Sequence, residues 1–154
     1  MITISDILRP NHIALDLRAT EAKAAIDEVT ALLKNNPGVS DWDALHKGVH
    51  IAAPCLPEPA GGFSLCIPHT RGECVSSMVM SVGRSGAGII FPGVALPVRY
   101  LFCIGVPRAL AADYLRIVGL LARVFKDRTA EEELRVIQSA SDFVNRLSLR
   151  EAKL

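Results

Sequence analysis

The sequence has few aromatic residues, almost no net charge and no low-complexity tract. Aromatic residues make up 5% of its 154 residues, and the formal net charge is +1. A near-neutral chain lacks the basic surface of a dedicated nucleic-acid-binding protein. Half of the residues are hydrophobic, which excludes intrinsic disorder. We therefore expect one globular domain over residues 1–154, with a mainly aliphatic core.

Patterns typical of export, membrane insertion and disulfide chemistry are also missing. Residues 1–6 show no basic region followed by an apolar stretch, so we expect no signal peptide and a cytoplasmic location. None of the four cysteines pairs in a C-x-x-C pattern, and we expect all four to be reduced thiols. The apolar segment 88–107 is interrupted by three prolines and Arg99, which favours buried strands over a membrane helix.

The familiar cofactor motifs are absent as well. There is no G-x-G-x-x-G, no P-loop and no H-E-x-x-H, and we expect neither a cofactor nor a metal. His12, His46 and His50 lie in polar or helical contexts, where an isolated histidine is usually structural or solvated.

What the sequence does contain is a regular alternation of helix-like and strand-like segments. Helices are expected over 20–35 after a Thr20 cap, over 41–49 after an Asp41 cap, and over 109–126. Two more are expected after Thr129, which opens a T-x-x-E capping box, and after Ser141. Strands are expected over 13–17, 63–67, 75–82, 88–91 and 98–104, with a turn at 83–86 and a proline-rich loop at 53–62. This order indicates an α/β fold with a mixed sheet sandwiched by helices.

His69 is the candidate functional residue because of its neighbours. It follows Pro68 at the end of an apolar strand, and Thr70 and Arg71 come next. A neutral imidazole is a good nucleophile, and a guanidinium matches the geometry of a phosphate. On these residues alone, an ordinary histidine at a surface turn is the simpler interpretation.

Two other interpretations use the same segment. Cys66, His69 and Cys74 have spacings that would allow a metal site completed by a distant fourth ligand. A Cys–His nucleophilic pair is also conceivable, although no third group is available to orient the histidine.

The chain as a whole resembles the fructose/mannitol-type enzyme IIA domains of the bacterial phosphotransferase system, especially the stand-alone nitrogen-regulatory IIA proteins. The resemblance rests on Leu65–Arg71, which reads L-C-I-P-H-T-R, on the strand pattern of 88–91 and 97–107, and on the long helix of 114–127. It covers about residues 3–148.

The resemblance implies that His69 accepts a phosphoryl group from an HPr-like carrier protein and passes it on or regulates a partner protein. Arg71, Thr70 and Ser64 would then support the phosphate, and Tyr114 stands where the family has a second histidine. The arginine and hydroxyl-rich loop of the family is replaced by the proline-rich segment 54–59. An IIA-fold regulatory binding module that has lost efficient phosphoryl transfer is therefore the alternative.

Overall fold

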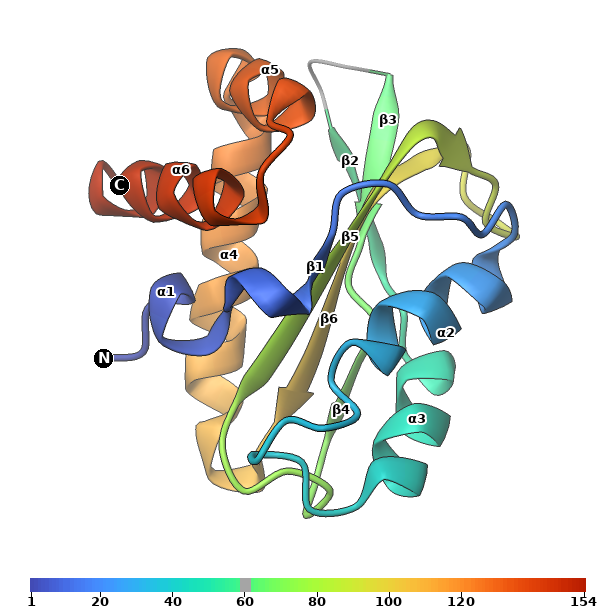
Figure 1. The fold of residues 1–154 in the computed structure, drawn as a ribbon, viewed down its shortest axis with the longest axis vertical. Coiled ribbons are helices and arrows are strands. Elements are labelled where there is room, and N and C mark those ends of the chain that lie inside the picture. Colours follow the sequence, from blue (N-terminus) through green and yellow to red (C-terminus); the bar gives the residue numbers. More distant parts are fainter. Residues whose placement is uncertain (59–61) are drawn as a thin grey trace.

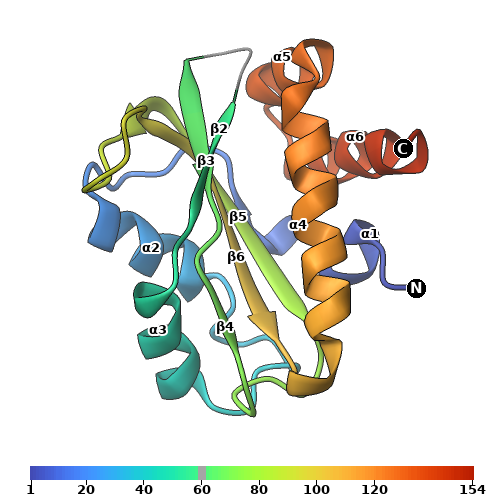
Figure 2. The ribbon, with the colours of Figure 1, turned by 180° about the vertical axis from the view of Figure 1, so that it is seen from behind.

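A mixed sheet lies between two layers of helices in the computed structural model, which describes residues 1–58 and 62–154 (Figures 1 and 2). The strands are β1 (Ile13–Ala14), β2 (Cys55–Glu58), β3 (Phe63–Cys66), β4 (His69–Arg71), β5 (Val79–Ile89) and β6 (Val98–Val106). The helices are α1 (Ile4–Ile7), α2 (Ala22–Ala31), α3 (Trp42–Ile51), α4 (Ala111–Lys126), α5 (Arg128–Val136) and α6 (Ala140–Ala152). Short 3₁₀ turns occupy Pro10–His12 and Arg108–Leu110. The α/β sandwich predicted from the sequence is confirmed.

β6 is the central strand of the sheet. The strand order is β1-β5-β6-β3-β2, and β4 pairs with β6 beyond β3. β6 runs antiparallel to β5 and parallel to β3 and β4. Every residue of β6 is buried, because both faces of the sheet are covered by helices.

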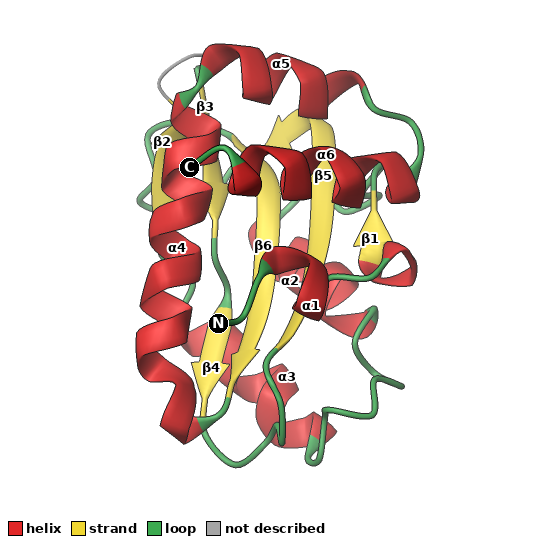
Figure 3. Cartoon of the chain, turned by 90° about the vertical axis from the view of Figure 1, so that its left-hand side faces the viewer, coloured by secondary structure: helices red, strands yellow, loops and turns green. Residues whose placement is uncertain are grey.

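The side chains of β6 alternate between two apolar cores. Tyr100, Phe102 and Ile104 pack on the side of α1, α4, α5 and α6. Leu101 and Cys103 pack on the opposite side, where α2 and α3 cover the sheet (Figure 3). This period of two is the geometry of an extended strand, and it explains why the predicted strand reads as a continuous apolar run.

The predicted turn at 83–86 is wrong, because β5 continues through it to Ile89. Gly83 lies against Leu17, where an added Cβ would come within 2.7 Å of the leucine side chain. The Arg84 guanidinium is buried and donates to the carbonyl oxygens of Leu15 and Leu134. Gly83 therefore allows Leu17 to pack closely against the strand. The pairing of β5 with β6 shifts register between Arg84 and Ile89.

The prediction of a loop over 53–62 is wrong for β2. Cys55–Glu58 forms an edge strand antiparallel to β3, with Pro57 opposite Ser64. An edge strand tolerates proline because one row of its backbone groups needs no strand partner. Residues 59–61 of the predicted loop lie outside the described residues.

The expectation of four reduced cysteines is also wrong. A disulfide joins Cys55 on β2 to Cys66 on β3, and the two residues are directly paired in the sheet. Cys74 and Cys103 are free and buried. Burial raises the pKa of the Cys103 thiol to about 11, so this thiol stays protonated.

Several element boundaries differ from the predictions by a few residues. The Asp41 cap is confirmed, since its carboxylate accepts from the Ala44 amide. The caps of the other helices are Glu21, Asp127 and Ser139 in place of Thr20, Thr129 and Ser141. β1 is shorter than predicted, and α2 ends at Ala31. Asp127 and Ser139 lie two residues upstream of the predicted caps and accept from helix amides, whereas Glu21 lies one residue downstream of Thr20 and makes no side-chain cap hydrogen bond.

Segment 88–107 contains the end of β5 and all of β6, as expected for buried strands. Among the helices of the described residues, none combines the length and apolar character needed to cross a membrane.

Candidate functional site

β3 and β4 are two parts of one extended segment that follows the same edge of β6. The segment is interrupted at Ile67 and Pro68, and pairing resumes with His69 opposite Ile104. Pro68 has no amide hydrogen, but its carbonyl oxygen accepts from the Ile104 amide at 2.9 Å. His69 thus lies just past the end of β3, as predicted, and is the first residue of the short strand β4.

The imidazole of His69 is held by two contacts at one nitrogen. Its Nδ1 lies 3.0 Å from the carbonyl oxygen of Ile67 and 3.1 Å from the hydroxyl oxygen of Tyr114. The Tyr114 ring, from the first turns of α4, stacks on the imidazole with centroids 4.7 Å apart. A nearby backbone carbonyl and a side chain from the distant helix α4 therefore fix the orientation of the ring.

These contacts determine which nitrogen is available as a nucleophile. A carbonyl oxygen only accepts hydrogen bonds, so Nδ1 must carry the proton that it donates to Ile67. In the neutral ring, Nε2 then holds the free lone pair. The contacts at Nδ1 thus leave Nε2 as the ring nitrogen without a hydrogen-bond partner among those that the structure shows for His69.

Tyr114 contributes a neutral hydroxyl. Burial raises the pKa of its phenol above the ordinary value, so the group stays protonated at physiological pH. The hydroxyl faces an Nδ1–H that already donates to Ile67. It can accept part of that hydrogen bond and direct its own hydrogen elsewhere.

A small cavity of about 200 Å³ opens beside His69. It is lined by His69, Arg71, Val106, Ala111, Tyr114 and Leu115. Ala111 begins α4, and no side chain caps this helix end. The exposed Arg71 forms no ion pair among the described residues. A free guanidinium and the uncapped start of a 16-residue helix both favour an anion at this position.

Thr70 and Ser64, two of the residues predicted to support a phosphate, do not line this cavity. Thr70 alternates with His69 along β4, and its side chain lies against Gly48 of α3 on the other side of the strand. Ser64 pairs with Val98 on β6 while His69 pairs with Ile104. That separation of six residues along β6 corresponds to about 20 Å. The structure brings His69, Arg71 and Tyr114 together.

The remaining histidines and the cysteines do not join the His69 site. Cys66 is bound in the disulfide and so offers neither a thiolate ligand nor a nucleophile. Within residues 1–58 and 62–154, the one group of three side chains suited to a metal is Asp27, His46 and His50. His12, predicted in a polar setting, is buried. The Ile67 carbonyl could not be identified from the sequence, because every residue has a backbone carbonyl and the amino-acid type does not show which one contacts the imidazole.

The chain is similar to known proteins over most of its length. Residues 6–149 match the family model described as phosphoenolpyruvate-dependent sugar phosphotransferase system, EIIA 2. A fructose-specific EIIA component of the phosphotransferase system from Haloferax volcanii is 35% identical over 74 residues, about half of each chain (47% and 48%). A nitrogen regulatory protein from Bradyrhizobium diazoefficiens is 24% identical over 147 residues, 95% of each chain.

The fold is shared with a solved structure of the nitrogen regulatory protein IIA-Ntr from Neisseria meningitidis, with a TM-score of 0.80 and 23% identity over 94% of this chain and 98% of that one. The family match spans almost the whole chain, including β4, β6 and α4, which carry the residues that line the His69 cavity. This chain therefore belongs to the EIIA 2 family of the phosphoenolpyruvate-dependent sugar phosphotransferase system.

Proposed function

We propose that this protein is a regulatory phosphocarrier that accepts a phosphoryl group on Nε2 of His69 from an HPr-like carrier protein. The observation that carries the proposal is the Ile67 carbonyl 3.0 Å from Nδ1, which in the neutral ring gives Nε2 the free lone pair, in a cavity that Arg71 and the start of α4 also line.

The transfer step needs no protein base. The Nε2 lone pair attacks the phosphorus, a new N–P bond forms, and the N–P bond of the donor histidine breaks with its electron pair returning to the donor ring. The phosphorylated ring becomes cationic at Nδ1–H, and the hydrogen bond to the Ile67 carbonyl strengthens as this charge develops. Arg71 balances the charge on the phosphoryl oxygens.

A partner protein needs an accessible surface around the histidine. Leu115 lines the cavity, and 67% of it is exposed. An exposed leucine at the rim of the cavity is an apolar contact that a docking protein could bury. The relatives named as nitrogen regulatory proteins support a regulatory role.

The test is phosphorylation by phosphoenolpyruvate, enzyme I and an HPr-type carrier, followed by intact-mass measurement. We expect an acid-labile gain of one phosphate that is lost in His69→Ala. Arg71→Ala should slow the gain without changing the thermal midpoint, because Arg71 is exposed. No gain with several carriers, from a folded protein, would refute the proposal.

Docking can be tested separately with a matched pair of variants. Leu115→Asp should slow transfer, whereas Leu149→Asp on α6, where the leucine is 53% exposed, should not. Equal rates would show that the α4 rim is not the docking surface.

The alternative is a regulatory binding module of the same fold without efficient transfer. It is favoured by the absence of Thr70 and Ser64 from the His69 cavity, which leaves Arg71 as the one cationic side chain among the described residues that could contact a phosphate there. Equal affinity of the wild-type protein and the His69→Ala variant for a partner, together with no gain of phosphate, would support this alternative.

A further inference from the structure

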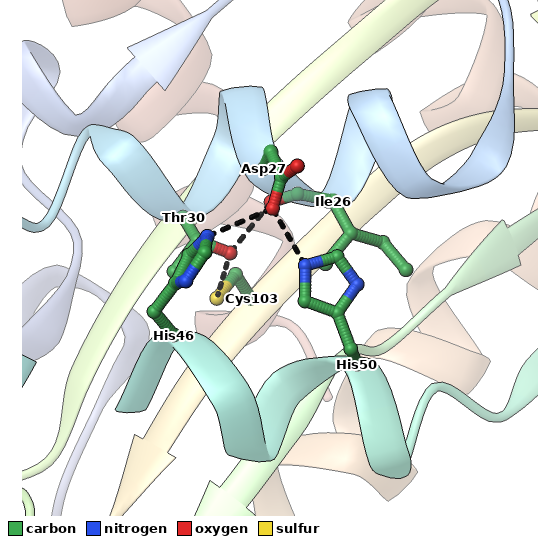
Figure 4. A network of polar contacts seen from close by, with 6 residues as sticks. All are labelled: Ile26, Asp27, Thr30, His46, His50 and Cys103. Carbon is green, nitrogen blue, oxygen red and sulfur yellow. Dashed lines mark hydrogen bonds and ion pairs between the residues drawn. The ribbon is translucent and has the colours of Figure 1, made fainter. Parts of the chain in front are cut away.

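Three polar side chains meet between α2 and α3, apart from the His69 cavity. His46 and His50 are four residues apart on α3, and both point toward Asp27 on α2 (Figure 4). Nε2 of His46 lies 2.8 Å and Nε2 of His50 lies 2.6 Å from the same oxygen, Oδ1 of Asp27. The three ligand atoms all lie within 4.8 Å of one another.

This donor set is chemically selective. Two imidazole nitrogens and one carboxylate oxygen are typical ligands of Zn²⁺ and similar first-row divalent metals, whereas Mg²⁺ prefers oxygen ligands alone. Histidines at i and i+4 lie on one helix face, the spacing by which helical metal sites present two imidazoles to one ion.

The two nitrogen–oxygen separations are also close to those that a metal requires. Tetrahedral ligands about 2.0–2.1 Å from Zn²⁺ lie roughly 3.3–3.5 Å from one another. The two observed pairs at 2.6 and 2.8 Å would have to open by less than about 1 Å. The side chains of His46 and Asp27 are each 42% exposed, and that of His50 is 23% exposed, so the rings can adjust and an ion can enter from solvent.

We propose that Asp27, His46 and His50 form a Zn²⁺ site that joins α2 to α3, with solvent completing the coordination. The proposal is independent of phosphoryl transfer. Gly48, between the two histidines in sequence, faces β4, so α3 presents one face to the metal and another to the strand that carries His69. Bound Zn²⁺ would fix α2 and α3 to each other without taking part in chemistry at His69.

The single tryptophan provides a local reporter. The Trp42 ring stacks on His46 with centroids 5.6 Å apart. A paramagnetic ion such as Co²⁺, bound at His46, would lie close enough to quench Trp42 fluorescence strongly. An ion bound at a distant histidine would quench it much less.

The experiment titrates the full chain with Zn²⁺ by calorimetry and native mass spectrometry, and with Co²⁺ by fluorescence. Thiol reductants are left out because they bind zinc themselves. We expect one Zn²⁺ per chain, quenching of Trp42 by Co²⁺ that excess Zn²⁺ reverses, and no response to Mg²⁺. His50→Gln and Asp27→Asn should each weaken binding by at least about 100-fold, because loss even of a group supporting a ligand costs 10–100-fold.

The control is His69→Ala, which should bind Zn²⁺ as wild type does and so exclude the phosphate-acceptor histidine as the site. Thermal melts with a chelator present would verify that every variant folds. Absence of stoichiometric Zn²⁺, or unchanged affinity in folded His50→Gln and Asp27→Asn, would overturn the proposal and leave the cluster as an interhelical ion pair.

Discussion

Gly48 sets how closely α3 approaches β4, and replacing it with alanine tests this packing. An ideal Cβ at Gly48 would lie 2.6 Å from the Cβ of Thr70 and would overlap its hydroxyl. A rotation of the threonine side chain cannot relieve a contact with its own Cβ, so the helix or the strand has to move.

Two opposing effects determine the size of the change. Glycine-to-alanine substitution inside a helix ordinarily stabilises by about 0.5–1 kcal/mol. Overpacking a filled interface costs about 1–3 kcal/mol. For Gly48→Ala we expect overpacking to dominate, with a net loss of about 1–2 kcal/mol and a melting midpoint lower by about 2–8 °C.

Gly119 in α4 is the matched control, because an added Cβ there meets nothing within 4 Å. Gly119→Ala should therefore raise the midpoint by up to about 4 °C. Both variants are measured by thermal and urea denaturation. The Thr70→Gly variant removes the side chain that an alanine at position 48 would meet. Adding Gly48→Ala to Thr70→Gly should therefore lower the melting midpoint much less than adding it to the wild-type chain. Equal stability of Gly48→Ala and Gly119→Ala would show that Gly48 is not closely packed against Thr70.

Three further predictions concern other contacts. Tyr114→Phe keeps the ring stack and removes only the hydroxyl, so single-turnover phosphorylation should slow by no more than about 10-fold; a much larger loss would place the hydroxyl on the phosphate. Glu131→Ala leaves buried Arg99 without its carboxylate partner and should lower the free energy of unfolding, measured in urea, by about 3–5 kcal/mol. The Glu132 side chain is 52% exposed, so the control Glu132→Ala should change this free energy by less than about 0.5 kcal/mol. Burial, followed by the charge of a nearby arginine, lowers the pKa of His12, so the unfolded chain takes up the proton first and stability falls as the pH drops below about 6.5. His12→Gln should flatten the dependence of the melting midpoint on pH between 7.5 and 5, and equal slopes would contradict this origin.

Features that depend on local pattern were predictable from the sequence. The apolar run of β6 indicated a strand covered on both faces, and Asp41 is the helix cap that it was expected to be. Burial and capping act within a few residues, so the sequence pattern records them directly.

Features that depend on a distant partner were not predictable. Proline-rich Cys55–Glu58 becomes a strand because β3 offers an edge, and Cys55 meets Cys66 only through that pairing. β5 continues through Gly83 because this residue pairs with β6, and Leu17 packs where a side chain at Gly83 would lie. In each case a tertiary neighbour outweighed the local preference of the sequence.

The candidate site shows the same division within a single strand. The sequence identified His69 and Arg71, which lie on the side of β4 that faces α4, but it also grouped Thr70 with them because it is their neighbour in the chain. Strand alternation places Thr70 on the α3 side, where it serves packing against Gly48. A substitution at the α3 interface can therefore reach the imidazole only by moving the backbone of β4. Such a change should alter stability and phosphorylation together, whereas a change at Arg71 should alter phosphorylation alone.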